Sequence, residues 1–225
     1  MKSFKTLYVF VAHIDDLEFS CLGYLLNTYY NRIKIVIATT WEPKAKVFEK
    51  NLQRLMGQLK LEMELSCRRR ITKIEYVNLK FDQRVIPTHF DEVKNSFYKQ
   101  VDFTEDFDIL THDKSDAHTD HRALHEIALG LYKYTDRFIT IYSPEAINFI
   151  PNYFVELSKE QLEFKKELLD NYNFNEEQSY AKKGKYFEDN RINLPSFYAL
   201  ENFHNKDMEG CEIYKIHKWL SKSTF

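Results

Sequence analysis

The sequence is short of glycine, proline and cysteine and has no long apolar run, and each shortage excludes a class of protein. Glycine and proline number five each, and the turn from His13 to Asp16 contains neither, which excludes a glycine-rich phosphate loop there. The three cysteines have no paired spacing, so we expect neither a disulfide framework nor a cysteine zinc site, and a cytoplasmic location. No stretch approaches the roughly 20 apolar residues that cross a bilayer, so we expect no membrane insertion.

Charge and length are equally restrictive. Lys and Arg number 32 and Asp and Glu 34, a net charge of −2, so we expect no overall attraction to nucleic acid. The one short basic run, Cys67 to Arg70, we interpret as a solvated loop. A chain of 225 residues is long enough for one α/β domain and short for two. With no repeat or low-complexity linker, residues 1–225 are predicted to form a single domain.

Apolar runs alternate with amphipathic stretches through the first two thirds of the chain, which predicts a mostly parallel sheet flanked by helices. The predicted strands are Leu7–Ala12, Ile33–Ala38, Ile74–Leu79, Phe107–Thr111 and Phe138–Tyr142. The predicted helices are Leu17–Tyr30, Val47–Leu65, Phe90–Val101, His121–Tyr134 and Leu157–Asn171. A late strand running into a short helix at Cys211–Leu220 is predicted to belong to a C-terminal elaboration of the same domain.

The first polar cluster, His13 to Asp16, follows the first predicted strand. It places Asp15 and Asp16 side by side at a helix amino terminus, where the helix dipole favours negative charge. The two carboxylates still repel each other, and a cation would relieve that repulsion. His and Asp are suitable ligands for a divalent metal. The alternative interpretation is an Asp helix cap with a spare acid beside it.

The second cluster runs from His112 to His121, after the fourth predicted strand. His118 and His121 lie where a loop turns into a helix and can face one pocket, with Asp120 supporting an imidazole. The alternative is a polar loop that caps the helix through Asp116 or Asp120. In a sheet of this class ligands bind beyond the carboxyl ends of the strands, so neighbouring strands would bring the two clusters together.

Other histidines carry weaker signals. His121 and His125 have the spacing of a zinc protease helix, but Arg122 stands where that motif needs a glutamate. We therefore reject a protease and interpret His125 as a surface or supporting histidine. The isolated His89, His204 and His217 are interpreted as having no role in the site.

The two clusters together resemble the PIG-L/LmbE family of zinc-dependent N-deacetylases. That family carries Ala-His-Pro-Asp-Asp-x-Glu after its first strand and His-x-Asp-His later. Here Ala12 to Glu18 reads Ala-His-Ile-Asp-Asp-Leu-Glu, and His118 to His121 reads His-Thr-Asp-His. The resemblance covers residues 7 to about 205. Ile14 replaces the family's proline, and the loop Thr39–Pro43, which we expect to shape the substrate pocket, lacks the glycines common in relatives.

The resemblance implies a Rossmann-like fold and one Zn²⁺ per chain, with another divalent metal as an alternative. It assigns His13, Asp16 and His121 as the metal ligands, which leaves a coordination position open for water. It makes Asp15 the general base and protonated His118 the group that stabilises the tetrahedral intermediate. It makes Asp120 the acid that orients His118. Residues that bind the substrate outside these motifs are not identified.

The implied reaction is hydrolysis of the acetamide of an N-acetylated sugar, of the N-acetylglucosamine-conjugate type, to acetate and a free amino sugar. One alternative is a metal-dependent hydrolase of another amide on the same site. A second is a non-enzymatic sugar- or nucleotide-binding module with a vestigial site. The partner is expected to be a small molecule, and a homo-oligomer is left open.

Overall fold

The computed structural model describes residues 5–40, 45–65, 73–143, 145–170 and 210–219. One seven-stranded sheet has the order β3-β2-β1-β4-β5-β7-β6. The strands are β1 (Lys5–Val11), β2 (Arg32–Thr39), β3 (Lys73–Phe81), β4 (Asp106–His112), β5 (Arg137–Ile141), β6 (Tyr153–Glu156) and β7 (Cys211–Trp219). The helices are α1 (Asp16–Ser20), α2 (Leu22–Asn27), α3 (Ala45–Leu65), α4 (Phe90–Tyr98), α5 (Thr119–Leu129) and α6 (Lys159–Asp170).

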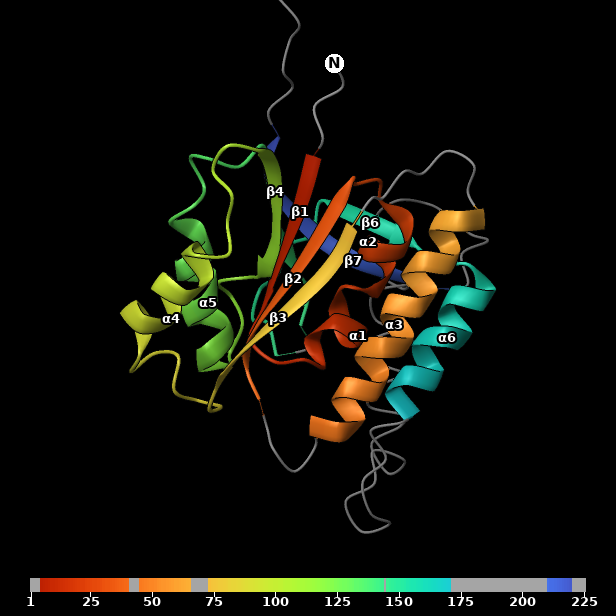
Figure 1. Cartoon of the computed structure of the whole chain (residues 1–225), viewed down its shortest axis with the longest axis horizontal. Helices are drawn as coiled ribbons and strands as arrows, with labels where there is room; N and C mark the ends of the chain where they lie inside the picture. Colours follow the sequence, from red (N-terminus) through yellow and green to blue (C-terminus); the bar gives the residue numbers. More distant parts are fainter. Residues whose placement is uncertain (1–4, 41–44, 66–72, 144, 171–209, 220–225) are drawn as a thin grey trace, which may run out of the picture.

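Helices cover both faces of the sheet. In Figure 1, α4 and α5 lie on one side, and α1, α2, α3 and α6 lie on the other. Strands β1 to β5 pair in parallel, while β7 runs antiparallel to both β5 and β6. The predicted α/β fold with a mostly parallel sheet is therefore confirmed.

The central strand β1 is buried on both faces, as its continuous apolar sequence predicts. Successive side chains of a strand point to opposite faces. Leu7, Val9 and Val11 therefore join the apolar core on the side of α2, α3 and α6. Tyr8 and Phe10 join the second core with residues of α4 and α5. Both cores fix β1, and so the polar turn that follows it.

The order of the strands places a crevice beside β1. From β1 the chain adds β2 and then β3 on one side, and later adds β4 and β5 on the other. Loops that leave β1 and β4 at their carboxyl ends therefore diverge to opposite faces, and ligands of such sheets bind where this happens. The two polar clusters both begin at this point.

The first predicted helix, Leu17–Tyr30, is two helices instead of one. α1 ends at Ser20 and α2 begins at Leu22, with Cys21 between them at φ −119° and ψ −12°. The amides of Gly23 and Tyr24 are bonded to side chains of β7. β7 lies about 190 residues away in the sequence, so the local pattern of apolar residues does not predict this break.

Other elements also depart from the predictions. α5 ends at Leu129 instead of Tyr134, because the amides of Leu131 and Tyr132 bond three residues back in a tight final turn. Strand β6 was not predicted. β7 remains a strand to Trp219, so the short helix predicted before Leu220 is wrong over the described residues. The basic run Cys67 to Arg70, His204 and the resembling stretch beyond residue 170 lie outside the described residues.

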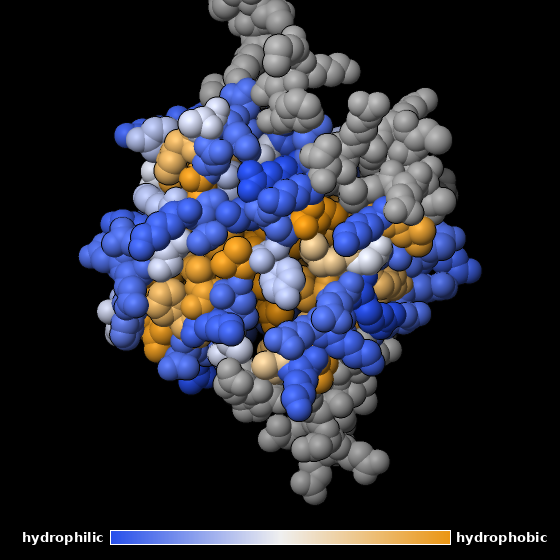
Figure 2. Space-filling model, viewed as in Figure 1, coloured by the Kyte–Doolittle hydropathy of each residue, from blue (hydrophilic) through white to orange (hydrophobic). Residues whose placement is uncertain are grey.

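The face seen in Figure 2 is mixed in character. Hydrophilic side chains cover the helices at either side, and apolar ones gather between them over the open edge of the sheet. Edge strand β3 carries charged Lys73 and Glu75, whose side chains pair at 2.5 Å, and such charges disfavour pairing with a second sheet. Among the described residues, no helix combines the length and apolar character needed to cross a membrane.

At the amino ends of the strands, a buried carboxylate ties three elements together. Asp108 of β4 is fully buried and contacts the Lys5 ammonium at 2.7 Å and the Arg137 guanidinium at 2.7 Å. It also accepts a hydrogen bond from the Tyr30 hydroxyl at 2.7 Å. This cluster lies at the opposite ends of the strands from the two polar turns.

We predict that Asp108→Asn lowers the free energy of unfolding by about 2 to 3 kcal/mol. The loss stays below that of a fully buried pair because Lys5 and Arg137 reach solvent and keep part of their hydration. Urea unfolding measures it, with Asp136→Asn, whose carboxylate is 3.5 Å from Lys5, as a control that should lose less than about 1 kcal/mol. Equal losses in the two variants would contradict the special role of Asp108.

Candidate metal centre

The two polar turns meet at the carboxyl ends of β1 and β4. These strands are adjacent and parallel, with Phe10 opposite Thr111, so both turns leave the same edge of the sheet. Nδ1 of His13 lies 3.1 Å from Nε2 of His121. Residues 108 positions apart in the sequence therefore face each other at the carboxyl ends of the two strands.

Asp16 completes a group of three. Its Oδ2 lies 3.5 Å from Nδ1 of His13, and its Oδ1 lies 3.4 Å from Nε2 of His121. All three side chains are buried, and Asp16 is further fixed because its Oδ2 accepts the backbone N–H of His13 at 2.8 Å. The structure thus brings together the three residues that the sequence motifs assign as metal ligands.

Each imidazole of this group also contacts a second carboxylate, through the ring nitrogen that points away from the other histidine. We call this the outer nitrogen. Nε2 of His13 donates to Oδ2 of Asp120 at 3.4 Å, and Nδ1 of His121 donates to Oδ2 of Asp116 at 2.8 Å. Metal-binding histidines in proteins are held in this way, which fixes the tautomer. When both rings are neutral, the protons on the outer nitrogens leave lone pairs on Nδ1 of His13 and Nε2 of His121, which face each other.

Two lone pairs 3.1 Å apart repel unless positive charge lies between them. Burial disfavours charge on His13, yet its bonds to Asp120 and Asp16 outweigh this and raise the pKa of His13 to about 10. Burial also opposes charge on His121, but Asp16 and Asp116 raise its pKa to about 9. The surrounding carboxylates therefore favour a cation, and the donor atoms fit a divalent metal.

His118 caps the amino end of α5. Its Nδ1 accepts the backbone N–H of Asp120 at 3.2 Å, and its ring packs edge-on against His13 at 4.8 Å between centroids. The proton of neutral His118 is therefore on Nε2, the nitrogen left free to donate. Burial lowers the pKa of His118, and the nearby His121 and His13 lower it further. A His118 nitrogen also lies within 4.8 Å of nitrogens of His13 and His121.

Asp120 contacts a different histidine from the one expected. The prediction is that it orients His118, but its carboxylate lies against His13, and only its backbone N–H reaches His118. The carboxylate also accepts the backbone N–H of Arg84 at 2.6 Å. Arg84 has φ 66°, a left-handed conformation that aims this N–H at Asp120. The loop after β3 thereby helps to hold the carboxylate that holds His13.

Asp15 is half-buried at the amino cap of α1, directly before Asp16. One of its carboxylate oxygens lies within 4.8 Å of ligand atoms of both His13 and Asp16. Its side chain makes no capping hydrogen bond to α1, which disfavours the interpretation of Asp15 as a mere helix cap. The carboxylate is thus beside the candidate metal ligands.

The sequence analysis includes His112 in the second cluster but assigns it no role. Its ring stacks on His121 at 3.8 Å between centroids with 11° between the planes, and its Nε2 lies 3.2 Å from Asp16. That nitrogen also accepts the backbone N–H of Ala12 at 3.0 Å. Burial and the nearby His121 lower the pKa of His112 to about 4, so the ring is neutral. Its place at the last residue of β4 was the available signal.

The sequence analysis interprets Asp116 only as a possible helix cap. In the structure, its two carboxylate oxygens contact different residues. Oδ1 accepts the backbone N–H of His118 at 2.8 Å and orders the turn before α5, while Oδ2 holds His121. The need for one carboxylate per metal-binding histidine could have identified it.

The remaining histidines among the described residues lie outside the group. His125 is buried and hydrogen-bonds the carbonyl of His112 at 2.9 Å, so it is a supporting residue and not a surface one. His217 lies 3.0 Å from Thr140 and 3.4 Å from Asp113. His89 is exposed.

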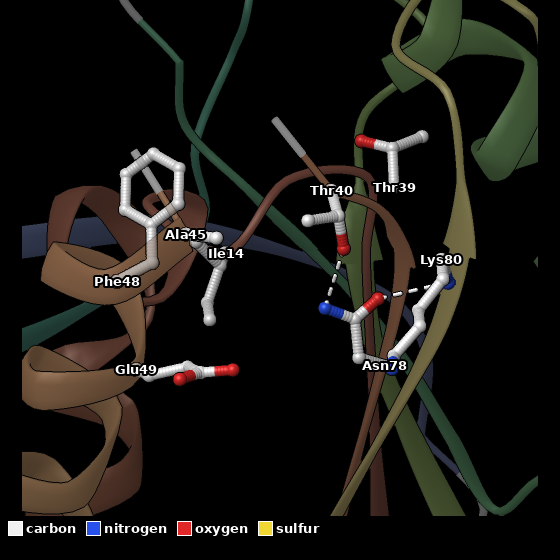
Figure 3. A pocket seen from close by; sticks show the side chains of 8 residues that line it. All are labelled: Ile14, Thr39, Thr40, Ala45, Phe48, Glu49, Asn78 and Lys80. Carbon is white, nitrogen blue, oxygen red and sulfur yellow. Dashed lines mark hydrogen bonds between the residues drawn. The ribbon is translucent and has the colours of Figure 1, made fainter. Parts of the chain in front are cut away.

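A cavity of about 230 Å³ opens beside the cluster. Ile14, between His13 and Asp15, forms part of one wall with Phe48 and Glu49 of α3, and the opposite wall comes from the ends of β2 and β3 (Figure 3). There the Asn78 amide donates to the Thr40 hydroxyl at 2.7 Å. The lining residues are Ile14, Thr39, Thr40, Ala45, Phe48, Glu49, Asn78 and Lys80. Thr39 and Thr40 begin the loop expected to shape the pocket, and residues 41–43 of that loop lie outside the described residues.

Several solved structures share this fold. An N,N'-diacetylchitobiose deacetylase from Pyrococcus horikoshii is 15% identical over 96% of this chain and 84% of its own, with a TM-score of 0.59. A deacetylase triple mutant from the teicoplanin biosynthetic pathway is 15% identical over 97% of this chain and 100% of its own, with a TM-score of 0.53. GalB, a 4-carboxy-2-hydroxymuconate hydratase from Pseudomonas putida, is 11% identical over 98% and 99%, with a TM-score of 0.65.

At these identities the likeness shows the fold alone, and the presence of a hydratase means that the fold does not decide the reaction. No curated protein sequence gives a significant match. The sequence itself matches the PIG-L family model, GlcNAc-PI de-N-acetylase, over residues 8–132. This stretch is more than half of the chain and contains every residue of the metal-binding group. The protein therefore belongs to the PIG-L family of de-N-acetylases.

Proposed function

We propose that the protein is a zinc-dependent de-N-acetylase that hydrolyses the acetamide of an N-acetyl sugar conjugate. The observation that carries the proposal is the group of His13, Asp16 and His121, whose ligand atoms approach one another within 3.5 Å. Membership of the PIG-L family supports the same reaction. The ring of outer carboxylates supports a bound cation.

His13, Asp16 and His121 would hold the metal through two imidazole nitrogens and a carboxylate. Two nitrogens and one oxygen are a catalytic zinc set, because three protein ligands leave a position open. Zinc, when bound, polarises the acetamide carbonyl and makes water acidic enough to attack at neutral pH. The same ligands suit other divalent metals, so the ion present in the isolated protein is to be measured.

Asp15 is the proposed general base. In this assignment Asp15 lies beside the ligand atoms without binding the metal, and its carboxylate would take a proton from the attacking water. The water oxygen then bonds to the carbonyl carbon. When the C–N bond breaks, the amine nitrogen takes the proton from Asp15, which leaves acetate and a free amine. One carboxylate thus acts first as base and then as acid.

His118 is proposed to donate a hydrogen bond from Nε2 to the oxygen that becomes negative during attack. Because its Nδ1 accepts the N–H of Asp120, a second proton on the ring would meet that N–H. We therefore infer a neutral donor in place of the protonated His118 expected from the sequence. One such donor is worth roughly 3 kcal/mol of transition-state stabilisation.

The cavity beside the cluster favours a sugar as the substrate. Its walls combine the Asn78 amide and the Thr40 hydroxyl with the apolar side chain of Phe48. Glu49 and Lys80 add an acceptor and a donor at the rim. A sugar ring presents hydroxyls that need both donors and acceptors, and C–H faces that pack on aromatic rings. Binding sites mix polar and apolar groups in this way.

Acetate release from N-acetylglucosamine conjugates tests the function. We expect equal amounts of acetate and amine from the zinc-loaded protein, loss of activity on chelation and recovery when zinc is added back. Simple N-acyl amines are the comparison substrates. Activity on those alone would favour hydrolysis of another amide, and tight zinc binding without hydrolysis of any amide would contradict the proposal.

Asp15→Asn separates the base from the metal ligands. The amide keeps the size of the side chain but cannot take a proton, so we expect kcat/KM to fall about 10²- to 10⁴-fold, with zinc affinity almost unchanged. Asp116→Asn is the matched variant, because it disturbs the support of His121 and should weaken zinc binding about 10- to 100-fold. Full activity in Asp15→Asn would refute the assignment of the base.

A further inference from the structure

The helix that carries Asp16 cannot be stable by itself. α1 has five residues. A single turn of helix is unstable by itself because the conformational entropy lost in nucleation exceeds the gain from its few hydrogen bonds. The break at Cys21 also interrupts the run of helical hydrogen bonds to the backbone groups at the end of α1 and the start of α2. Both ends are buried, so these groups need partners from elsewhere.

A lysine supplies the partner at the carboxyl end of α1. Lys165 of α6 has a fully buried side chain, and its ammonium donates to the carbonyl of Phe19 at 2.9 Å. Phe19 lies three residues after Asp16. The positive charge also suits the carboxyl end of a helix, where backbone carbonyls concentrate negative charge.

A glutamate and a tyrosine supply the partners at the amino end of α2. Oε2 of Glu212 accepts the N–H of Gly23 at 2.8 Å, and the hydroxyl of Tyr214 accepts the N–H of Tyr24 at 3.0 Å. The Tyr214 hydroxyl in turn donates to Glu212. A Cβ on Gly23 would lie 3.1 Å from Oε2 of Glu212 and 2.9 Å from Leu157, so glycine permits the close approach.

The two caps are joined into one unit. The Lys165 ammonium and Oε1 of Glu212 are 2.5 Å apart, and both side chains are buried. Burying two charges has a large desolvation cost, so an ion pair here is not explained by stability alone. The lysine comes from α6 and the glutamate from β7, both beyond residue 132 where the family match ends. The C-terminal part of the chain thus reaches the helix that holds Asp16.

We propose that Lys165 and Glu212 are positioning residues that hold α1 so that Asp16 faces His13 and His121. The proposal rests on the proposed metal-binding function. Neither residue touches the ligand atoms. They act through the backbone at the break between α1 and α2, and loss of either cap lets α1 shift or unwind. Asp16 then leaves the short distances that it keeps to both histidines.

Zinc affinity and stability, measured separately in the full chain, test the proposal. Zinc binding is followed by competition with a coloured chelator without substrate, and unfolding of the metal-free protein is followed in urea. We expect Lys165→Met and Glu212→Gln each to weaken zinc binding of the folded protein at least about tenfold, as loss of outer support does at other metal sites. Asp108→Asn, which breaks a buried ion pair at the far ends of the strands, should destabilise the fold but leave zinc affinity unchanged.

The double variant with Lys165→Met and Glu212→Gln separates positioning from stability. Removing both charges leaves no unpaired buried ion, so stability should recover relative to the single variants. Zinc affinity should remain low, because methionine cannot donate to the Phe19 carbonyl. If Lys165→Met does not fold, Glu212→Gln and the double variant still decide the matter.

The outcomes are distinguishable. Wild-type zinc affinity in the folded variants, or affinity that recovers together with stability in the double variant, would overturn the positioning role and leave the metal site intact. A wild-type protein that binds no zinc would overturn the proposed function, and the inference with it.

Discussion

The structure depends on one electrostatic constraint: two imidazole nitrogens, from His13 and His121, face each other 3.1 Å apart inside a ring of carboxylates. The outer nitrogens of both rings are committed to Asp120 and Asp116. The inner nitrogens therefore present lone pairs to the same small space, with Asp16 beside them. Only positive charge makes this arrangement favourable, and a divalent metal supplies it in a form that can also do chemistry.

The fold supplies this arrangement through parallel pairing and burial. Strands β1 and β4 are neighbours in the sheet, and their following turns leave the same edge with no freedom to separate. The apolar cores on both faces fix β1, and α5, which His118 caps, fixes His121 in its first turn. The weak point is α1, which is short and carries Asp16. Its dependence on α6 and β7 gives the C-terminal elaboration a function beyond closing the sheet.

The sequence predicted the strands of the parallel sheet because their apolar runs are continuous, and it predicted where the two polar clusters would lie. It could not predict the break at Cys21, since the partners of the Gly23 and Tyr24 amides come from β7. The family resemblance assigns Asp120 to His118, and spacing along the chain does not show that its carboxylate reaches His13 instead. The stacking of His112 on His121 likewise depends on the register between a strand and a helix.

Membership of the PIG-L family and the local chemistry agree on de-N-acetylation, but they contribute different parts of the account. The family match ends at residue 132, so it includes the metal-binding group and not the caps that support α1. The cavity beside the group depends on the ends of β2 and β3 and the start of α3, where relatives can differ while the reaction stays the same. In the proposed account, the reaction depends on the geometry of the two turns, and the choice of substrate depends on the loops around them.

The most direct test of the central claim is anomalous diffraction from crystals of the zinc-loaded protein, with data collected on both sides of the zinc absorption edge. The account predicts one anomalous peak, which marks a zinc ion bonded to Nδ1 of His13, Nε2 of His121 and a carboxylate oxygen of Asp16. Asp15 should not be bonded to this ion. A peak at another place, or one bonded to His13 through Nε2 with Asp120 displaced, would contradict it.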